Sequence, residues 1–76
     1  MSVRVLFFGM IAAKLGQREC TVPASEGMTL ATLVHLVGCA DFNPLLLAVN
    51  QSQVNDMKRL INDGDEVAIM PPFAGG

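Results

Sequence analysis

Charged residues are scarce in this sequence of 76 residues, and tryptophan and tyrosine are absent. Lys, Arg, Asp and Glu make up 16% of the chain, against about 25% in an average soluble domain. The basic residues are scattered and the net charge is −2, which argues against nucleic acid as a partner. Hydrophobic residues reach 51%, more than one small domain can bury, so we expect an apolar surface patch where a partner binds.

Long apolar runs and targeting signals are missing as well. The longest run is LLLAV at residues 45–49, far below the ~20 residues that span a bilayer. The strand-like VRVLFF segment near the start lacks the basic region and small-residue cleavage site of a secretory signal. The sequence therefore predicts no membrane partner and a cytoplasmic location.

Residues that carry catalysis or bind metals are few and dispersed. Cys20 and Cys39 are too far apart for a CxxC pair, and the only histidine, His35, has no neighbouring ligand types. We favour the interpretation that both cysteines are small buried hydrophobic residues, rather than reactive thiols or a disulfide. Turn geometry explains the acidic stretch DGDE at residues 63–66, and we favour it over a metal site. We expect no independent catalysis, so the chemistry belongs to partners.

The first part of the chain has the alternation of two strands. In VRVLFFG, at residues 3–9, Val3, Val5 and Phe7 point to one face of a strand. Leu6 and Phe8 point to the other face, together with Arg4. A short turn or helical piece is expected around residues 12–15, before Gly16. Residues 19–22 alternate as a second strand. The two strands are predicted to form a hairpin-like pair.

An amphipathic helix is predicted after the SEG loop at residues 25–27. Its apolar residues recur at helical spacing, at Leu30, Leu33, Val34 and Val37. Thr29 can cap its N-terminus, and Gly38 can close its C-terminus in the left-handed conformation. His35 lies opposite the apolar stripe, so we expect it to be solvated and assign it no role.

The second half of the chain is predicted to contain three strands. After the Asn-Pro breaker at residues 43–44, LLLAVNQ is typical of a buried strand that ends in a turn at residues 50–51. An edge strand is expected around residues 53–54. A turn at residues 63–64 belongs to a DGDEVA hairpin, and residues 67–70 form the last strand. The predicted fold class is α+β, a mixed sheet packed on one main helix.

The sequence ends on MPPFAGG, residues 70–76, in which two stiff prolines are followed by two glycines. Pro71 and Pro72 favour an extended segment, whereas Gly75 and Gly76 let another chain approach the backbone closely. A frayed end explains the glycines equally well. We expect a domain over residues 1–70 and an extended tail over residues 71–76.

Three stretches give the chain a specific resemblance to a known family. VRVLFFG, LLLAVNQSQV and LINDGDEVAIMPPFAGG resemble the small subunit of molybdopterin synthase, a sulfur carrier of the ubiquitin-like superfamily. A terminal Gly-Gly alone is a weak signal, but a VNQ turn, a DGDEVA segment and PPxxGG together are a strong combination. The resemblance implies a ubiquitin-like β-grasp fold with a free C-terminal tail.

The resemblance also implies a function that lies in the last carboxylate. An activating enzyme that uses ATP would adenylate Gly76, which then becomes a thiocarboxylate and delivers sulfur to a pterin precursor; no bound cofactor is implied. Adenylation makes an acyl centre that sulfur can attack, and Gly75 and Gly76 carry no side chains to obstruct a narrow channel. The implied partners are this activating enzyme and the large subunit of molybdopterin synthase, in a heterotetramer with two carriers.

The face of the sheet that the helix leaves uncovered is the expected docking surface. Strand parity places Leu6, Phe8, Ala68 and Met70 on it, and imperfect alternation in a core strand is the alternative. The resemblance implies contacts with the large subunit and the activating enzyme by three body residues and three tail residues. They are Phe8, Leu60, Met70, Pro71, Pro72 and Phe73.

Other functions of the same fold stay open. The carrier that serves thiamine synthesis shares the terminal Gly-Gly but usually lacks paired prolines, so Pro71 and Pro72 favour molybdopterin synthase. A ubiquitin-like modifier joins its C-terminus to lysines of target proteins, and an interaction module uses only the sheet. Intact mass separates them, because a thiocarboxylate exchanges oxygen for sulfur, a modifier forms lysine conjugates, and an interaction module does neither.

Overall fold

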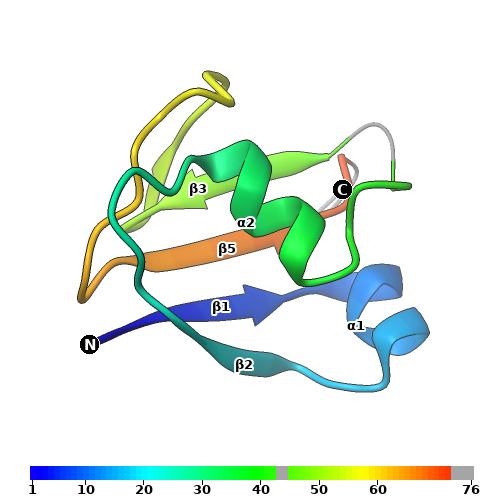
Figure 1. The fold of residues 1–76 in the computed structure, drawn as a ribbon. Coiled ribbons are helices and arrows are strands. Elements are labelled where there is room, and N and C mark those ends of the chain that lie inside the picture. Colours follow the sequence, from blue (N-terminus) through cyan, green and yellow to red (C-terminus); the bar gives the residue numbers. More distant parts are fainter. Residues whose placement is uncertain (43–44, 73–76) are drawn as a thin grey trace.

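A five-stranded sheet forms the centre of the structure, a computed structural model that describes residues 1–42 and 45–72. The elements in chain order are β1 (Ser2–Phe7), α1 (Gly9–Leu15), β2 (Glu19–Pro23), α2 (Leu30–Leu36), β3 (Leu46–Val49), β4 (Ser52–Gln53) and β5 (Glu66–Met70). The strands lie in the order β2-β1-β5-β3-β4 (Figure 1). β5 is parallel to β1, whereas β1–β2, β3–β4 and β3–β5 are antiparallel. The predicted mixed sheet is confirmed.

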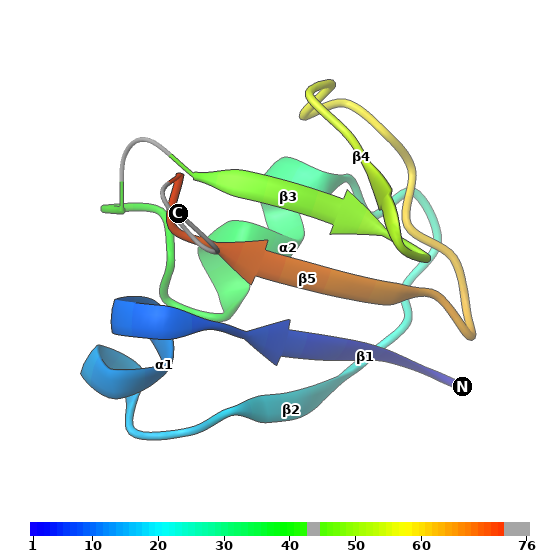
Figure 2. The same cartoon turned by 180° about the vertical axis from the view of Figure 1, so that it is seen from behind.

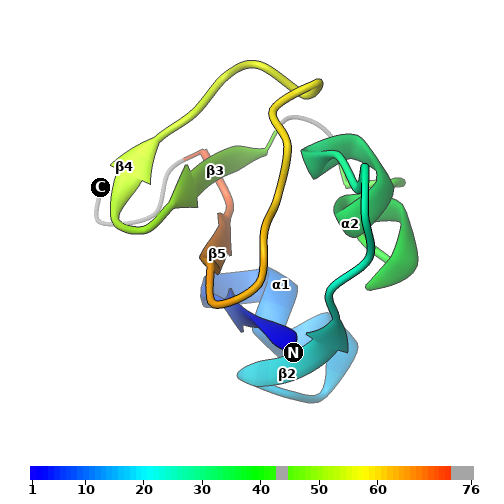
Figure 3. The same ribbon diagram turned by 60° about the vertical axis from the view of Figure 1, so that its left-hand side comes forward.

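Helix α2 covers one face of the sheet and leaves the other face open (Figures 2 and 3). Both of its predicted ends are confirmed. The Oγ1 atom of Thr29 accepts a hydrogen bond from the backbone N–H of Thr32 at 3.2 Å, and Gly38, just past the helix, has a φ of 81°. His35 is exposed, as expected. The predicted breaker at residues 43–44 lies outside the described residues.

The hydrophobic core lies between α2 and the covered face of the sheet. The strand residues that point into it are Val3, Val5, Phe7, Leu47, Val49, Val67 and Ile69. Cys39 packs in the core as the expected small hydrophobe, and Cys20 is half-buried beside it. Burial raises the pKa of both thiols, which favours the protonated, less nucleophilic form.

Helix α1 is longer than the sequence indicated. The expected piece at residues 12–15 is the second half of a helix that begins at Gly9, with only Phe8 between it and β1. Ile11 anchors this helix because its side chain is buried in the core. The helix ends at Gly16, whose φ of 74° lies in the left-handed region, as expected of a C-terminal glycine. The sequence pattern missed the first turn because Gly9 is a poor helix former.

The DGDE stretch forms the predicted turn, but the predicted DGDEVA hairpin is wrong. β5 pairs with β1 on one edge and with β3 on the other. The segment before the turn therefore has no free edge of β5 to pair with, and Leu60 instead forms a single bridge with Thr29. The edge strand β4 begins one residue earlier than predicted, at Ser52.

A hydrogen-bonded cluster joins the VNQ and DGDE motifs. The side-chain Oδ1 of Asn50 accepts from the backbone N–H of Glu66 at 2.9 Å, and its Nδ2 donates to Asp65 at 3.0 Å. The other carboxylate oxygen of Asp65 accepts from the backbone N–H of Asn62 at 2.8 Å. Asn50 has a φ of 50°, a conformation that asparagine tolerates better than most residues. The two motifs are therefore parts of one structural unit, and Asp65 serves the turn.

Replacing Asn50 should destabilise the fold. We expect Asn50→Ala to lower the free energy of unfolding by about 1–2 kcal/mol, because two hydrogen bonds are lost and alanine is strained at positive φ. Urea denaturation of the variant and of Asn55→Ala, at an exposed loop position, measures the difference. Equal stability of the two variants would show that the cluster contributes nothing.

Acid should weaken the same cluster. The N–H of Asn62 and the amide of Asn50 hold the pKa of Asp65 below its ordinary value, which is about 3.9 for aspartate. The folded state thus favours ionised Asp65, and this stabilisation is lost as the pH falls below about 4, through the lower folded-state pKa. Urea denaturation from pH 6 to pH 3 should show a smaller loss of stability in Asp65→Asn than in wild type. Asp41→Asn is the control variant. If stability fell with pH as steeply in Asp65→Asn as in wild type, this assignment would be contradicted.

Candidate functional site: the open face and the base of the tail

The C-terminal ends of β1 and β5 lie side by side at one end of the sheet, because the two strands are parallel neighbours. We call this end of the sheet the tail edge, since the tail follows β5 there. Phe7 lies opposite Ile69 in the register, and the backbone N–H of Phe8 donates to the carbonyl oxygen of Ile69 at 3.1 Å. Phe8 is 43% exposed, and Met70 is half-buried while Ile69 beside it is fully buried. The predicted parity of both strands is confirmed, and Phe8 and Met70 come together at this edge.

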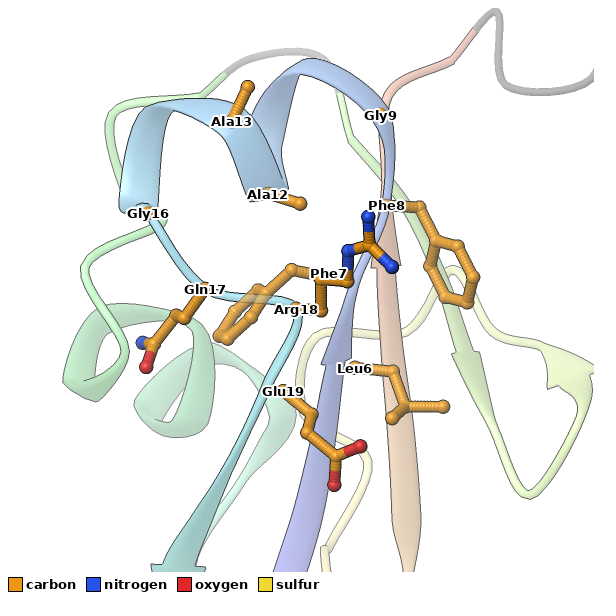
Figure 4. A pocket seen from close by; sticks show the side chains of 10 residues that line it. All are labelled: Leu6, Phe7, Phe8, Gly9, Ala12, Ala13, Gly16, Gln17, Arg18 and Glu19. Carbon is orange, nitrogen blue, oxygen red and sulfur yellow. The ribbon is translucent and has the colours of Figure 1, made fainter.

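An apolar patch extends from this edge across the open face of the sheet. Register pairs Leu6 with Ala68 and Met70 with Leu46, so their side chains share one face. Figure 4 shows Leu6 and Phe8 projecting to one side of β1 and Phe7 to the other. We call Leu6, Phe8, Leu46, Ala68 and Met70 the open-face patch. Leu46 was not predicted on this face, although its position next to buried Leu47 would have placed it there by alternation.

The opposite end of the open face is ionic. The Nε atom of Arg4 lies 3.2 Å from a carboxylate oxygen of Glu19, and its Nη1 lies 3.5 Å from one of Glu66. The hydrogen bond to Glu19 raises the pKa of Arg4. Such exposed pairs contribute little to stability. The open face is therefore apolar toward the tail and charged away from it, so an apolar partner surface fits at the tail end.

An open groove of about 800 Å³ lies beside the patch (Figure 4). Phe8, Gly9 and Ala12 line one part of it, and the segment that leads into β2 lines another, with Arg18 and Glu19. The small residues of α1 leave this space open. The groove could not be predicted from the sequence, because α1 and residues 17–19 form it only after the chain has turned back on β1.

The base of the tail lies beside Gly9, one of the residues that line this groove. Pro71 and Pro72 follow β5 directly and are half-buried. The tail residues Phe73, Gly75 and Gly76 lie outside the described residues, so their expected roles stay predictions.

Leu60 lies apart from the patch. Its side chain is 56% exposed, but its backbone bridges to Thr29, just before α2. The chain after Leu60 leads into the beginning of β5, whereas Phe8 and Met70 lie at the other end of β1 and β5. The structure does not bring Leu60 together with these two residues, and its contact with a partner stays a prediction.

Within residues 1–42 and 45–72, no group of three or more His, Cys, Asp or Glu side chains could hold a metal ion. Over the same residues, no helix has the length and apolar character needed to cross a membrane.

The strand order, the single helix over one face and the strand that leads into the tail define a ubiquitin-like β-grasp domain, and solved structures share this fold. SAMP1 from Haloferax volcanii aligns with a TM-score of 0.81 and 22% identity over 100% of both chains. The protein-protein complex of subunits 1 and 2 of molybdopterin-converting factor from Helicobacter pylori 26695 contains a chain that aligns with a TM-score of 0.70 and 22% identity, again over 100% of both chains. The predicted fold class is confirmed.

Sequence comparison identifies the family. Residues 5–76 match the ThiS family. The molybdopterin synthase sulfur carrier subunit of Chlamydomonas reinhardtii is 31% identical over 100% of both chains. That of Escherichia coli (strain K12) is 33% identical, over 97% of this chain and 99% of its own. The chain belongs to the ThiS family and is a relative of molybdopterin synthase sulfur carrier subunits, which confirms the resemblance found in the sequence.

Proposed function

We propose that this chain is the sulfur carrier subunit of a molybdopterin synthase and donates sulfur from a thiocarboxylate on Gly76. The observation that carries the proposal is the match to sulfur carrier subunits over essentially the whole length of both chains. The structure supports it in one respect: the last strand leads directly into Pro71 and Pro72 beside a partly exposed apolar patch, in which Phe8 is exposed and the other members are half-buried. A carrier needs both parts, because the patch holds the partner while the tail reaches its active site.

The proposed chemistry begins at the carboxylate of Gly76. An activating enzyme joins this carboxylate to AMP from ATP and releases pyrophosphate, because a free carboxylate is a poor electrophile. A sulfur nucleophile then attacks the acyl carbon and expels AMP, which leaves a thiocarboxylate. The thiocarboxylate sulfur then bonds to an electrophilic carbon of the pterin precursor, and water cleaves the acyl carbon–sulfur bond, so that the sulfur stays on the precursor and the oxygen of water restores the carboxylate. The chain supplies no catalytic side chain in this scheme and binds no cofactor; ATP is bound by the activating enzyme.

Two partners follow from this scheme. The first is the large subunit of the synthase, which we expect to bind the open-face patch; the Helicobacter pylori protein of the same fold is in a complex of subunits 1 and 2. The second is the activating enzyme, which must bind the same tail. We propose that both use Phe8 and Met70, so that binding is mutually exclusive. A heterotetramer and a cytoplasmic location stay predictions.

Reconstitution with both partners tests the proposal. The purified chain, incubated with the activating enzyme, ATP and sulfide, should gain the mass difference between sulfur and oxygen, and should lose it again when the large subunit and the pterin precursor are added. Omitting ATP is the control, because the carboxylate then stays unactivated.

Three other outcomes would contradict the proposal. A thiocarboxylate that forms but is not consumed by the large subunit would indicate another pathway, such as thiamine synthesis. Lysine conjugates in place of the thiocarboxylate would indicate a protein modifier. An unchanged mass would leave only an interaction module.

A further inference from the structure

Gly9 lies just past the end of β1, beside the point where the tail leaves β5. It follows Phe8 and has a φ of 57°. Continuing the parallel register from Phe7 and Ile69 brings Gly9 beside Pro71. A Cβ atom on Gly9 would lie 3.0 Å from Cγ of Pro71, closer than an ordinary carbon contact, and 3.4 Å from its Cδ, at the short limit of such a contact. A side chain at position 9 would therefore require the ring of Pro71 to move by a few tenths of an ångström.

This contact falls at the residue that determines how the tail leaves the domain. Pro71 is the first residue after β5, and its ring holds φ near −65°. A shift of the ring therefore turns the chain that follows it. The hydrogen bond from the N–H of Phe8 to Ile69 holds the two strand ends together directly before the contact, so a side chain at position 9 would push against Pro71 rather than separate the strands.

We propose that Gly9 is a positioning residue for sulfur transfer: its missing side chain forms the seat of Pro71 and so sets the direction in which the tail extends toward Gly76. This role rests on the proposed function. Gly9 contacts neither the reacting carboxylate nor a cofactor in this scheme and acts only through Pro71. The patch that we expect to hold the partner is formed by other side chains, so binding and turnover should respond differently to a change at position 9.

The other described glycines separate this role from backbone strain. Gly9, Gly16, Gly27, Gly38 and Gly64 all have positive φ, so alanine is strained at each of them. A Cβ on Gly27 would have no other atom within 4 Å, and Gly27 lies in the loop before α2, away from the open-face patch and the tail. Gly27→Ala therefore reproduces the strain of Gly9→Ala without the contact to Pro71.

The experiment compares these two variants of the full chain in the reconstituted synthase. We expect Gly9→Ala to bind the large subunit with a Kd within about twofold of wild type, and to transfer sulfur about tenfold more slowly at saturation, because small displacements of reacting groups are costly. Gly27→Ala should bind and turn over as wild type does. Melting temperatures of both variants show whether their loss of stability is similar.

A double variant and a direct measurement make the test specific. Pro71→Ala removes the ring atoms that a side chain at position 9 would meet, so Gly9→Ala should cost much less turnover in the Pro71→Ala background than in wild type. In the isolated wild-type protein, NMR should show cross-relaxation between the Hα protons of Gly9 and the ring protons of Pro71.

Several results would overturn the role of Gly9. Equal loss of turnover in Gly9→Ala and Gly27→Ala would assign the effect to backbone strain. An equal loss of turnover from Gly9→Ala in wild type and in the Pro71→Ala background would show that Gly9 does not act through Pro71. Absence of the NMR contact would contradict the seat itself. A wild-type chain that transfers no sulfur would instead overturn the proposed function, and with it this role, even if the NMR contact is present.

Discussion

Deleting Gly76 should abolish sulfur transfer and leave binding to the large subunit intact. Removing the residue moves the terminal carboxylate back by about 3.5 Å, whereas catalysis depends on placement to well under 1 Å. We expect turnover to fall at least about 100-fold. The Kd for the large subunit should stay near that of wild type, because we expect the open-face patch to supply most of the contact area. Intact mass and product formation in the reconstituted synthase measure the effect.

A lengthened tail is the matched variant for this deletion. One glycine added after Gly76 should fail in the same way, because the reacting carboxylate then lies beyond the required position. Both variants should still compete with the intact chain for the large subunit, and neither should form an adenylate or a thiocarboxylate with the activating enzyme and ATP. Normal turnover by either variant would refute a reaction at the terminal carboxylate and favour an interaction module.

Phe8→Asp should weaken binding to the large subunit by about 30-fold or more, or roughly 2 kcal/mol, because an unpaired charge would be desolvated in an apolar interface. Phe8 is 43% exposed and lies outside the core cluster, so the isolated domain should stay folded. Met70→Asp should weaken binding as well, but at a larger cost to stability, since Met70 is half-buried. Calorimetric titration and circular dichroism check the two effects.

Leu36→Asp is the matched control for the docking surface. Leu36 is 60% exposed on α2, on the side of the sheet away from the open-face patch, so this variant should bind normally. Weaker binding by Leu36→Asp, or normal binding by Phe8→Asp, would show that the partner docks elsewhere. Leu60→Asp measures how far the interface extends, because the structure places Leu60 away from Phe8 and Met70.

Several sequence predictions were confirmed because they depended on neighbouring residues. The cap at Thr29 and the left-handed residue at Gly38 mark the two ends of α2, as their local chemistry predicts. Alternation along residues 3–9 placed Phe7 inside and Phe8 outside, since successive side chains of a strand point to opposite faces. The expected DGDEVA hairpin at residues 63–68 was wrong, because a turn signal does not specify which strand its neighbour will pair with.

The functional site divides in the same way. The amino-acid sequence was sufficient for a mixed sheet on one helix, because that depends on hydrophobic period, and for the family, because three of its stretches resemble known members. The groove beside α1 and the contact of Gly9 with Pro71 needed the folded chain. Both arise because β1 and β5, far apart in the sequence, pair in parallel and end at the same edge. A sequence pattern carries the spacing within each strand, but the register between distant strands depends on how the whole core packs.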